Sequence, residues 1–177
     1  MHTEAYHYVL QKLRKIPQPS GVVEFGGRDL NGSVRRLYKT PNYVSIDLEA
    51  GPGVDIVADA EKFEWDNRWV VDHVISVETF EHAPNWKQLV ARGYELLEDG
   101  GYMIITCATD PREPHSTHDG VPIAIRALEA DEQYRNVPLE EMETCLREVG
   151  FEVLEINTLE RGDLRSFSRK PVVNGVH

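Results

Sequence analysis

Short apolar runs bounded by turn residues recur along this chain, and between them apolar residues repeat at helical spacing. This alternation predicts strands separated by helices, the pattern of an α/β domain with a mostly parallel sheet. The run at 102–107 is apolar almost throughout, which is typical of a strand buried on both faces of such a sheet. The strands are predicted over residues 22–25, 43–47, 54–58, 73–77, 102–107, 151–158 and 164–169.

Helical spacing predicts a first helix over residues 4–15 and a second helix in which Val34, Leu37 and Tyr38 share one face. A third helix is introduced by Asn85 and keeps one apolar face. We expect the glycine pair that follows it, at positions 100 and 101, to stop this helix.

The last part of the chain predicts a helix followed by a hairpin. Pro138 is suited to a helix start, and Gly150 is suited to the end of the same helix. The turn at 160–163 then joins the last two predicted strands. Between the fifth strand and this helix, residues 108–137 lose clear periodicity, with one candidate helix at 123–130. Long irregular segments in compact domains are usually functional or disordered.

Size and charge limit the classes of protein. The chain has 177 residues, of which 41% are hydrophobic and 28% charged, which suits a single α/β domain. The formal net charge of −11 argues against a protein that binds nucleic acid by neutralising phosphates. Basic residues gather near the C-terminus, either as a local basic groove or as the solvated side chains of an edge strand. They are Arg161, Arg165, Arg169 and Lys170.

Cysteine usage and hydropathy indicate the compartment. Only two cysteines occur, Cys107 and Cys145, and neither has a partner at metal-ligand spacing, so a reducing cytoplasm is expected. The N-terminus lacks the pattern of a secretory signal, and no apolar run approaches the roughly 20 residues that span a bilayer. We therefore expect a cytoplasmic protein with no membrane partner.

Carboxylates stand at or just after the ends of the first four predicted strands. In an open parallel sheet, ligands bind at the carboxyl ends of the strands, so these positions indicate a binding site. The glycines at 26 and 27 let the backbone approach a ligand, and Asp47 follows at about the spacing of a ribose-binding carboxylate in nucleotide-binding β-α-β units. The carboxylates are Glu24, Asp47, Asp59 and Glu78.

These motifs together resemble those of the class I S-adenosylmethionine-dependent methyltransferases, from residue 22 to about residue 169. Residues 24–27, Glu-Phe-Gly-Gly, resemble the acidic-x-Gly-x opening of that family, and residues 74–82 resemble its fourth strand ending in Glu-His. Residues 96–101 resemble the turn before its fifth strand. The sequence departs from the family where its second and third motif glycines fall at Arg28 and Leu30.

The resemblance implies a Rossmann-like, doubly wound, three-layered α/β fold with an antiparallel seventh strand and the order 3-2-1-4-5-7-6. It implies one domain over residues 1–170, with an N-terminal helical segment at 1–20, an acceptor lid at 108–137 and a tail at 171–177. The implied cofactor is S-adenosylmethionine. The residues implied to bind it are Glu24, Gly26, Gly27, Asp47, Leu48, Asp59, Ala60, Val77 and Glu78.

The acceptor end is less defined. His82 is the expected base for the acceptor's proton, because imidazole titrates near neutral pH, and Glu81 can serve instead. His115 and His118 can also reach the acceptor, and their spacing raises a metal hypothesis that lacks a third ligand, so no metal is predicted.

The sequence leaves alternatives open for the class of acceptor and for the class of enzyme. The net charge favours a small-molecule acceptor over nucleic acid and leaves a protein acceptor open, while the oligomeric state is not predicted. A nicotinamide-dependent oxidoreductase is the alternative enzyme, since a glycine turn and Asp47 can serve either cofactor. A non-catalytic nucleotide-binding module is the third reading.

Overall fold

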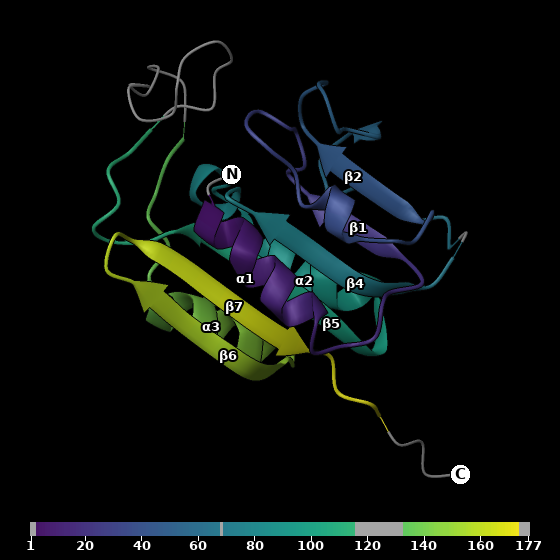
Figure 1. The fold of residues 1–177 in the computed structure, drawn as a ribbon. Helices are drawn as coiled ribbons and strands as arrows, with labels where there is room; N and C mark the ends of the chain where they lie inside the picture. Colours follow the sequence, from purple (N-terminus) through teal and green to yellow (C-terminus); the bar gives the residue numbers. More distant parts are fainter. Residues whose placement is uncertain (1–2, 68, 116–132, 174–177) are drawn as a thin grey trace.

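One mixed sheet organises the chain in the computed structural model, which describes residues 3–67, 69–115 and 133–173. The order is β3-β2-β1-β4-β5-β7-β6, as predicted (Figure 1). The two-residue β3 is shorter than its predicted range, and the other strands match their predictions closely at one or both ends. The strands are β1 Val22–Phe25, β2 Tyr43–Asp47, β3 Ile56–Val57, β4 Val71–Val77, β5 Leu97–Ala108, β6 Glu152–Leu159 and β7 Asp163–Arg169.

Strand direction divides the sheet into two parts. Strands β3, β2, β1, β4 and β5 run parallel to their neighbours, whereas β7 is antiparallel to both β5 and β6. The predicted hairpin between the last two strands is therefore confirmed. Because the parallel strands all end at the same edge, the segments that follow them are brought together there.

Helices cover both faces of the sheet and give three layers (Figure 1). Helix α1, Thr3–Leu13, lies on one face with a core that includes Val22 and Phe167. Helices α2, Trp86–Leu96, and α3, Leu139–Val149, lie on the other face. Gly150 ends α3 with a φ of 114°, a left-handed conformation that glycine adopts easily, as predicted.

The predicted second helix is wrong. This stretch holds only a 3-10 turn, η1 Arg35–Leu37, within an otherwise irregular segment. The Arg35 guanidinium donates to the carbonyls of Tyr43 and Gly53, at 3.2 and 3.3 Å, and forms an ion pair with Asp55 at 2.7 Å. These bonds to the neighbouring strand and loop hold the segment in a path that an α-helix would not follow.

The predicted stop of the third helix at the glycine pair is also wrong. Helix α2 ends at Leu96, and β5 begins at Leu97, which pairs with Val71 of β4. The Gly100 amide and the Gly101 carbonyl bond to the backbone of Lys170, so both glycines extend the sheet. In the part of the chain that is described, no helix has the length and apolarity to cross a membrane.

Candidate active site

The predicted site residues meet at the carboxyl edge of the parallel strands. Phe25 of β1 pairs with Ile46 of β2 and with Ser76 of β4, so the residues that follow these three strands are neighbours. The Gly26 amide donates to the Ile46 carbonyl at 2.8 Å and extends this pairing by one residue. The sheet therefore brings the glycine turn, the end of β2 and the end of β4 to one place.

The glycine turn is packed against a residue that the sequence did not single out. Gly26 has a φ of +71°, and a Cβ on it would lie 2.2 Å from Cγ2 of Thr79. The Thr79 hydroxyl lies 3.3 Å from the Gly26 carbonyl and 3.2 Å from the Val77 carbonyl, within hydrogen-bond distance of both. Thr79 thus fixes the turn to the end of β4, and its position inside the Glu-His motif was the only signal for it.

Glu24 lies beneath this turn rather than on its surface. Its carboxylate is buried, and Oε2 accepts a hydrogen bond from the Tyr43 hydroxyl at 2.8 Å. A Cβ on Gly27 would lie 2.6 Å from the same oxygen. Burial raises the pKa of Glu24 to about 7, and the Tyr43 hydrogen bond only partly opposes this. Glu24 therefore supports the turn from below.

Asp47 closes β2 directly beside the glycine turn. Its Oδ2 accepts from the Arg28 amide at 3.1 Å, and its Oδ1 accepts from the Glu49 amide at 3.0 Å. Each carboxylate oxygen has a second lone pair, so the group is oriented by the loop amides and can still accept further hydrogen bonds. Leu48, the next residue, is 73% exposed, which leaves an apolar surface next to the carboxylate.

Asp59 lies two residues beyond β3, on the same edge. Ala58 donates its amide to the Asp47 carbonyl at 2.9 Å, which ties this segment to the end of β2. The Asp59 carboxylate accepts from the Glu61 amide at 3.1 Å and from Lys62 Nζ at 2.8 Å, and the hydrogen bond from Lys62 lowers its pKa. Asp59 therefore caps a turn, and Ala60 packs beside the core within it.

Val77 and Glu78 end β4. Val77 is buried, and Glu78 has a φ of 55°, which is uncommon for a residue with a side chain and is found most often at functional sites. Glu78 Oε1 accepts from the Thr106 hydroxyl at 2.9 Å, and Oε2 lies 3.7 Å from the Arg112 guanidinium. The side chain thus turns towards β5, while its backbone stays at the sheet edge. No sequence signal pointed to Arg112.

Glu81 and His82 lie in a 3-10 turn, η2 Phe80–His82, directly after β4. The His82 ring contacts His115 and Tyr134, with ring centroids 5.3 and 5.2 Å apart, and the last two rings also contact each other at 5.2 Å. Burial lowers the pKa of His115. Glu81 is buried below these rings, and burial together with the nearby Glu78 raises its pKa to about 8.

The segment that leads into α3 closes this corner. The Arg135 amide donates to the Glu81 carbonyl at 2.8 Å, and the Val137 amide donates to the Ala108 carbonyl at 2.9 Å. Tyr134 is thereby held against His82. The central part of the predicted lid, with His118 and the candidate helix at 123–130, lies outside the described residues.

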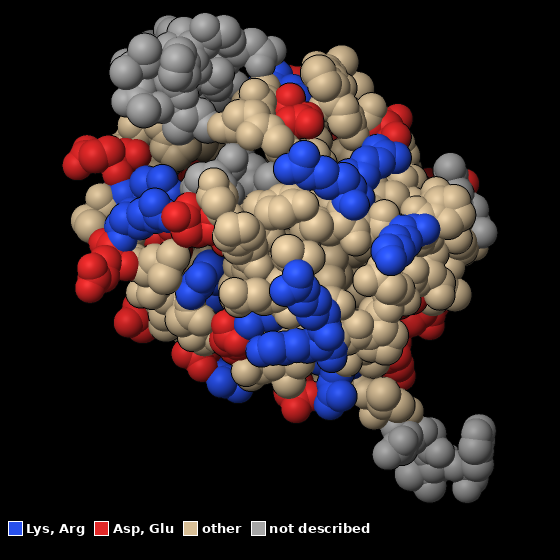
Figure 2. All heavy atoms as spheres, in the orientation of Figure 1, with Lys and Arg blue, Asp and Glu red and all other residues tan. Residues whose placement is uncertain are grey.

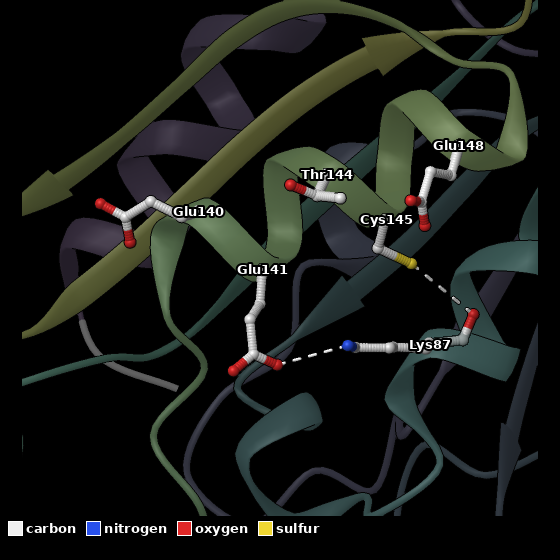
Figure 3. Close-up of a pocket in the computed structure, with 6 residues that line it drawn as sticks. All are labelled: Lys87, Glu140, Glu141, Thr144, Cys145 and Glu148. Carbon is white, nitrogen blue, oxygen red and sulfur yellow. Dashed lines mark hydrogen bonds and ion pairs between the residues drawn. The ribbon is translucent and has the colours of Figure 1, made fainter.

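Two surface hollows lie elsewhere. One of about 250 Å³ is lined by α2 and α3, with Lys87 bonded to Glu141 at 3.3 Å (Figure 3). The other, of about 390 Å³, lies between η1 and Gly53. No predicted site residue lines either hollow, so we take the site from the convergence of strand ends and not from these hollows.

The basic residues near the C-terminus have partners within the fold. On the face seen in Figure 2, Lys and Arg side chains lie among acidic and uncharged ones. This does not favour a basic groove, and the predicted edge strand is also wrong, because Arg165 and Arg169 belong to β7, which pairs with β5 on one side and with β6 on the other. The contacts are Arg161 with Asp163, Arg165 with Asn157, Arg169 with Glu152, and Lys170 with the carbonyls of Tyr94 and Leu97.

Comparison with known proteins identifies the type of domain. A family model described as a methyltransferase domain matches residues 2–156, most of the chain. Comparison with curated protein sequences gives no match.

Solved structures share the fold at low sequence identity. A Burkholderia thailandensis 1,6-didemethyltoxoflavin-N1-methyltransferase, solved with 1,6-didemethyltoxoflavin and S-adenosylhomocysteine, is 17% identical with a TM-score of 0.66, over 96% of this chain and 77% of that one. An S-adenosylmethionine-dependent methyltransferase from Clostridium acetobutylicum is 9% identical with a TM-score of 0.69, over 97% and 93%. The [4+2]-cyclase SpnF is 13% identical with a TM-score of 0.66, over 94% and 80%. Identities this low show the fold alone.

Proposed function

Because this chain belongs to the methyltransferase domain family, as a class I enzyme that uses S-adenosylmethionine, we propose that it transfers the methyl group to a small-molecule acceptor. The observation that carries the cofactor assignment is the Asp47 carboxylate. It stands beside the Gly26 turn, is oriented by the Arg28 and Glu49 amides and keeps lone pairs for a ligand. This arrangement suits a vicinal diol, which offers two hydroxyl donors.

The remaining cofactor contacts follow from the order of the strand ends. We assign the backbone at Gly26 and Gly27, above the buried Glu24, to the methionine part of the cofactor. The exposed Leu48 would pack on the adenine ring, since a large apolar side chain at the tip of a strand otherwise faces water. Asp59 and Ala60 would lie at the rim of the same ring.

Val77 and Glu78 would lie beneath the reacting methyl group. In this reaction the acceptor attacks the methyl carbon in line, the carbon–sulfur bond breaks, and the positive charge on sulfur is lost. The protein contributes chiefly alignment, and proximity and orientation can supply about 7 to 11 kcal/mol. His82 and Glu81 would serve the acceptor end, where a hydroxyl or amine must lose a proton.

A small-molecule acceptor is supported by two features. The net charge of −11 disfavours a polyanionic acceptor, and the basic residues near the C-terminus are engaged within the fold. The corner formed by His82, His115 and Tyr134 is lined by rings, which suits a compact acceptor. The oxidoreductase alternative loses its support, because the family model that matches the chain is a methyltransferase domain.

Calorimetry tests the assignment of Asp47. Asp47→Ala should weaken S-adenosylmethionine binding at least tenfold, or about 1.4 kcal/mol, because hydrogen bonds to a charged acceptor are lost. Asp99→Ala is the control, since Asp99 lies near the start of β5 and its Oδ2 binds the Val173 amide at 3.1 Å. An unchanged affinity in a folded Asp47→Ala protein excludes Asp47 from the site. Binding of nicotinamide dinucleotides in place of S-adenosylmethionine would refute the proposed function.

A further inference from the structure

We propose that Glu81, His82 and His115 form a binding site for a divalent transition metal ion at the acceptor end of the candidate active site. One ligand atom from each residue lies within 4.8 Å of the other two. Glu81 and His82 are consecutive in η2 after β4, and His115 comes from the segment that follows β5. The sheet brings the three residues together because β4 and β5 are parallel neighbours.

The spacing requires only a small closure around an ion. Donors around a tetrahedral ion with bonds of 2.0 to 2.2 Å are about 3.3 to 3.6 Å apart. His82 and His115 are partly exposed, so their rings can rotate inward without disturbing the core. Their planes already meet at 83°, with the two rings edge to face. Glu81 needs no movement of the backbone, because it is fixed by η2.

The buried carboxylate of Glu81 is an independent indication of a cation. Glu81 is 2% exposed, and no side chain among the described residues donates a hydrogen bond to its carboxylate oxygens, which have only the backbone amides of Glu81 and Ala108 nearby. Isolating a carboxylate from water with so few donors is unfavourable, and a metal ion relieves this. Glu78, three residues earlier, shows the contrast, since Thr106 and Arg112 occupy its oxygens.

His115 has the second contact that metal-binding histidines usually have. Its Nδ1 lies 3.3 Å from the Glu113 carbonyl, which can only accept, so Nδ1 carries the proton. The lone pair is then on Nε2 and is free to bind a metal ion. A backbone carbonyl that fixes the tautomer and orientation of a ligating ring is a common arrangement around metals. Tyr134 packs against both rings.

The donor set indicates the kind of ion. Two imidazoles and one carboxylate suit Zn²⁺ and its first-row neighbours, whereas Mg²⁺ and Ca²⁺ prefer oxygen donors alone. Sites with three protein ligands leave a position open for water or a substrate. We therefore assign the site to Zn²⁺ or an ion of similar chemistry.

The open position would take the oxygen of the acceptor, an assignment that rests on the proposed function. Binding to the ion acidifies a hydroxyl, which releases its proton to solvent water, because Glu81 and His82 as ligands of the ion do not also act as its base. The resulting oxyanion attacks the methyl carbon, the carbon–sulfur bond breaks, and a methyl ether and S-adenosylhomocysteine form. The acceptor class implied by the site is therefore a small molecule with a hydroxyl group.

Metal binding can be measured without an acceptor. Untagged protein is stripped with a chelator, dialysed against Zn²⁺ and analysed for bound zinc, and Co²⁺ is titrated as a coloured substitute. We expect one ion per chain. Glu81→Gln and His115→Ala should each weaken Zn²⁺ binding more than about tenfold. His7→Ala is the control, because His7 is exposed on α1 and belongs to no such cluster among the residues that the structure describes.

Two results would overturn the metal site. One is substoichiometric zinc in the wild-type protein, and the other is an unchanged affinity in both folded variants. Glu81→Gln keeps the size and shape of the side chain, so it is expected to fold, and a thermal scan checks this. Calorimetry with S-adenosylmethionine on the stripped protein separates the two proposals, since cofactor binding without zinc binding removes only the metal site.

The role of the ion has its own readout. Stripped protein should transfer at least tenfold less labelled methyl than zinc-loaded protein to a small-molecule extract treated with chelating resin, and the labelled product should be an ether. Equal transfer by stripped protein, or label on nitrogen, would refute the activation of a hydroxyl by the ion.

Discussion

Replacing Glu24 by glutamine should change how the stability of the protein depends on pH. The carboxyl group is buried and accepts a hydrogen bond from the Tyr43 hydroxyl at 2.8 Å. The glutamine carbonyl can accept the same bond. Ser45, whose hydroxyl is buried without a partner among the residues described, lies against the same glycine, Gly27, and offers an acceptor for the new amide. The Glu24→Gln variant therefore keeps the local packing and removes only the group that gains and loses a proton.

The sign and size of the effect follow from the pKa. Burial is the main cause that raises the pKa of Glu24 from its ordinary value of 4.5 to about 7; the Tyr43 hydrogen bond and the charge of Arg35 oppose it, and the charges of Asp29 and Asp55 add to it. Well below pH 4.5 the Glu24 carboxyl group is protonated in both the folded and the unfolded chain. As pH rises from 4.5 to 7, the unfolded chain loses the proton first, so the free energy of unfolding falls. One pKa unit corresponds to 1.36 kcal/mol, which gives a loss of about 3 kcal/mol.

Urea denaturation in the absence of cofactor measures this effect. The free energy of unfolding of Glu24→Gln minus that of the wild type should rise by about 2 to 3 kcal/mol between pH 5 and pH 8, because the other titrating groups cancel in the difference. Glu98→Gln is the control for the loss of one carboxylate, since Glu98 is exposed on β5. A difference that stays constant within about 0.5 kcal/mol would refute the buried, protonated state of Glu24.

Two further substitutions test the packing around the site and the sheet. In thermal denaturation, Gly26→Ala should destabilise the protein by more than Gly100→Ala. Both glycines have a positive φ, but a Cβ on Gly26 would lie 2.2 Å from Thr79, whereas a Cβ on Gly100 would lie 3.4 Å from Val172. Equal losses of stability would show that Thr79 moves aside freely. Lys170→Met should lower the free energy of unfolding in urea by about 1 to 3 kcal/mol, because Nζ donates to the carbonyls of Tyr94 and Leu97 at 3.0 and 2.7 Å. A loss below about 0.5 kcal/mol would mean that water replaces the ammonium group at the end of α2.

The strands were predictable from the sequence because a short run of apolar residues directly indicates a buried strand. Both ends of β1 and β2 match the prediction, since each is a short apolar run that a turn residue closes. The segment between them was not predictable to the same degree. Its apolar residues have helical spacing, but Arg35 bonds to residues of β2 and the following loop. Such a contact joins separate parts of the chain and leaves no local pattern.

The end of α2 shows the same limit in another form. Two consecutive glycines after an apolar helix are a common stop signal, and here they lie inside β5. Lys170, which is far along the chain, donates to the Tyr94 carbonyl in the last turn of α2 and to the Leu97 carbonyl at the start of β5, and its backbone bonds to both glycines. A long-range partner thus overrides a local signal.

The two ends of the site differ in how the sequence encodes them. Gly26 follows β1 and Asp47 ends β2, and these two strands are consecutive in the chain and adjacent in the sheet, so their spacing alone predicts that they meet. Glu81 and His82 acquire His115 only because the segment after β5 returns along the segment after β4, with His115 lying 33 residues after His82. The spacing of His115 and His118 raised a metal hypothesis, yet the partners that the structure gives His115 come from η2. The family match over residues 2–156 therefore identifies the methyl donor, whereas the acceptor depends on contacts between segments that are distant in the chain. For this reason the metal experiments bear directly on the identity of the acceptor.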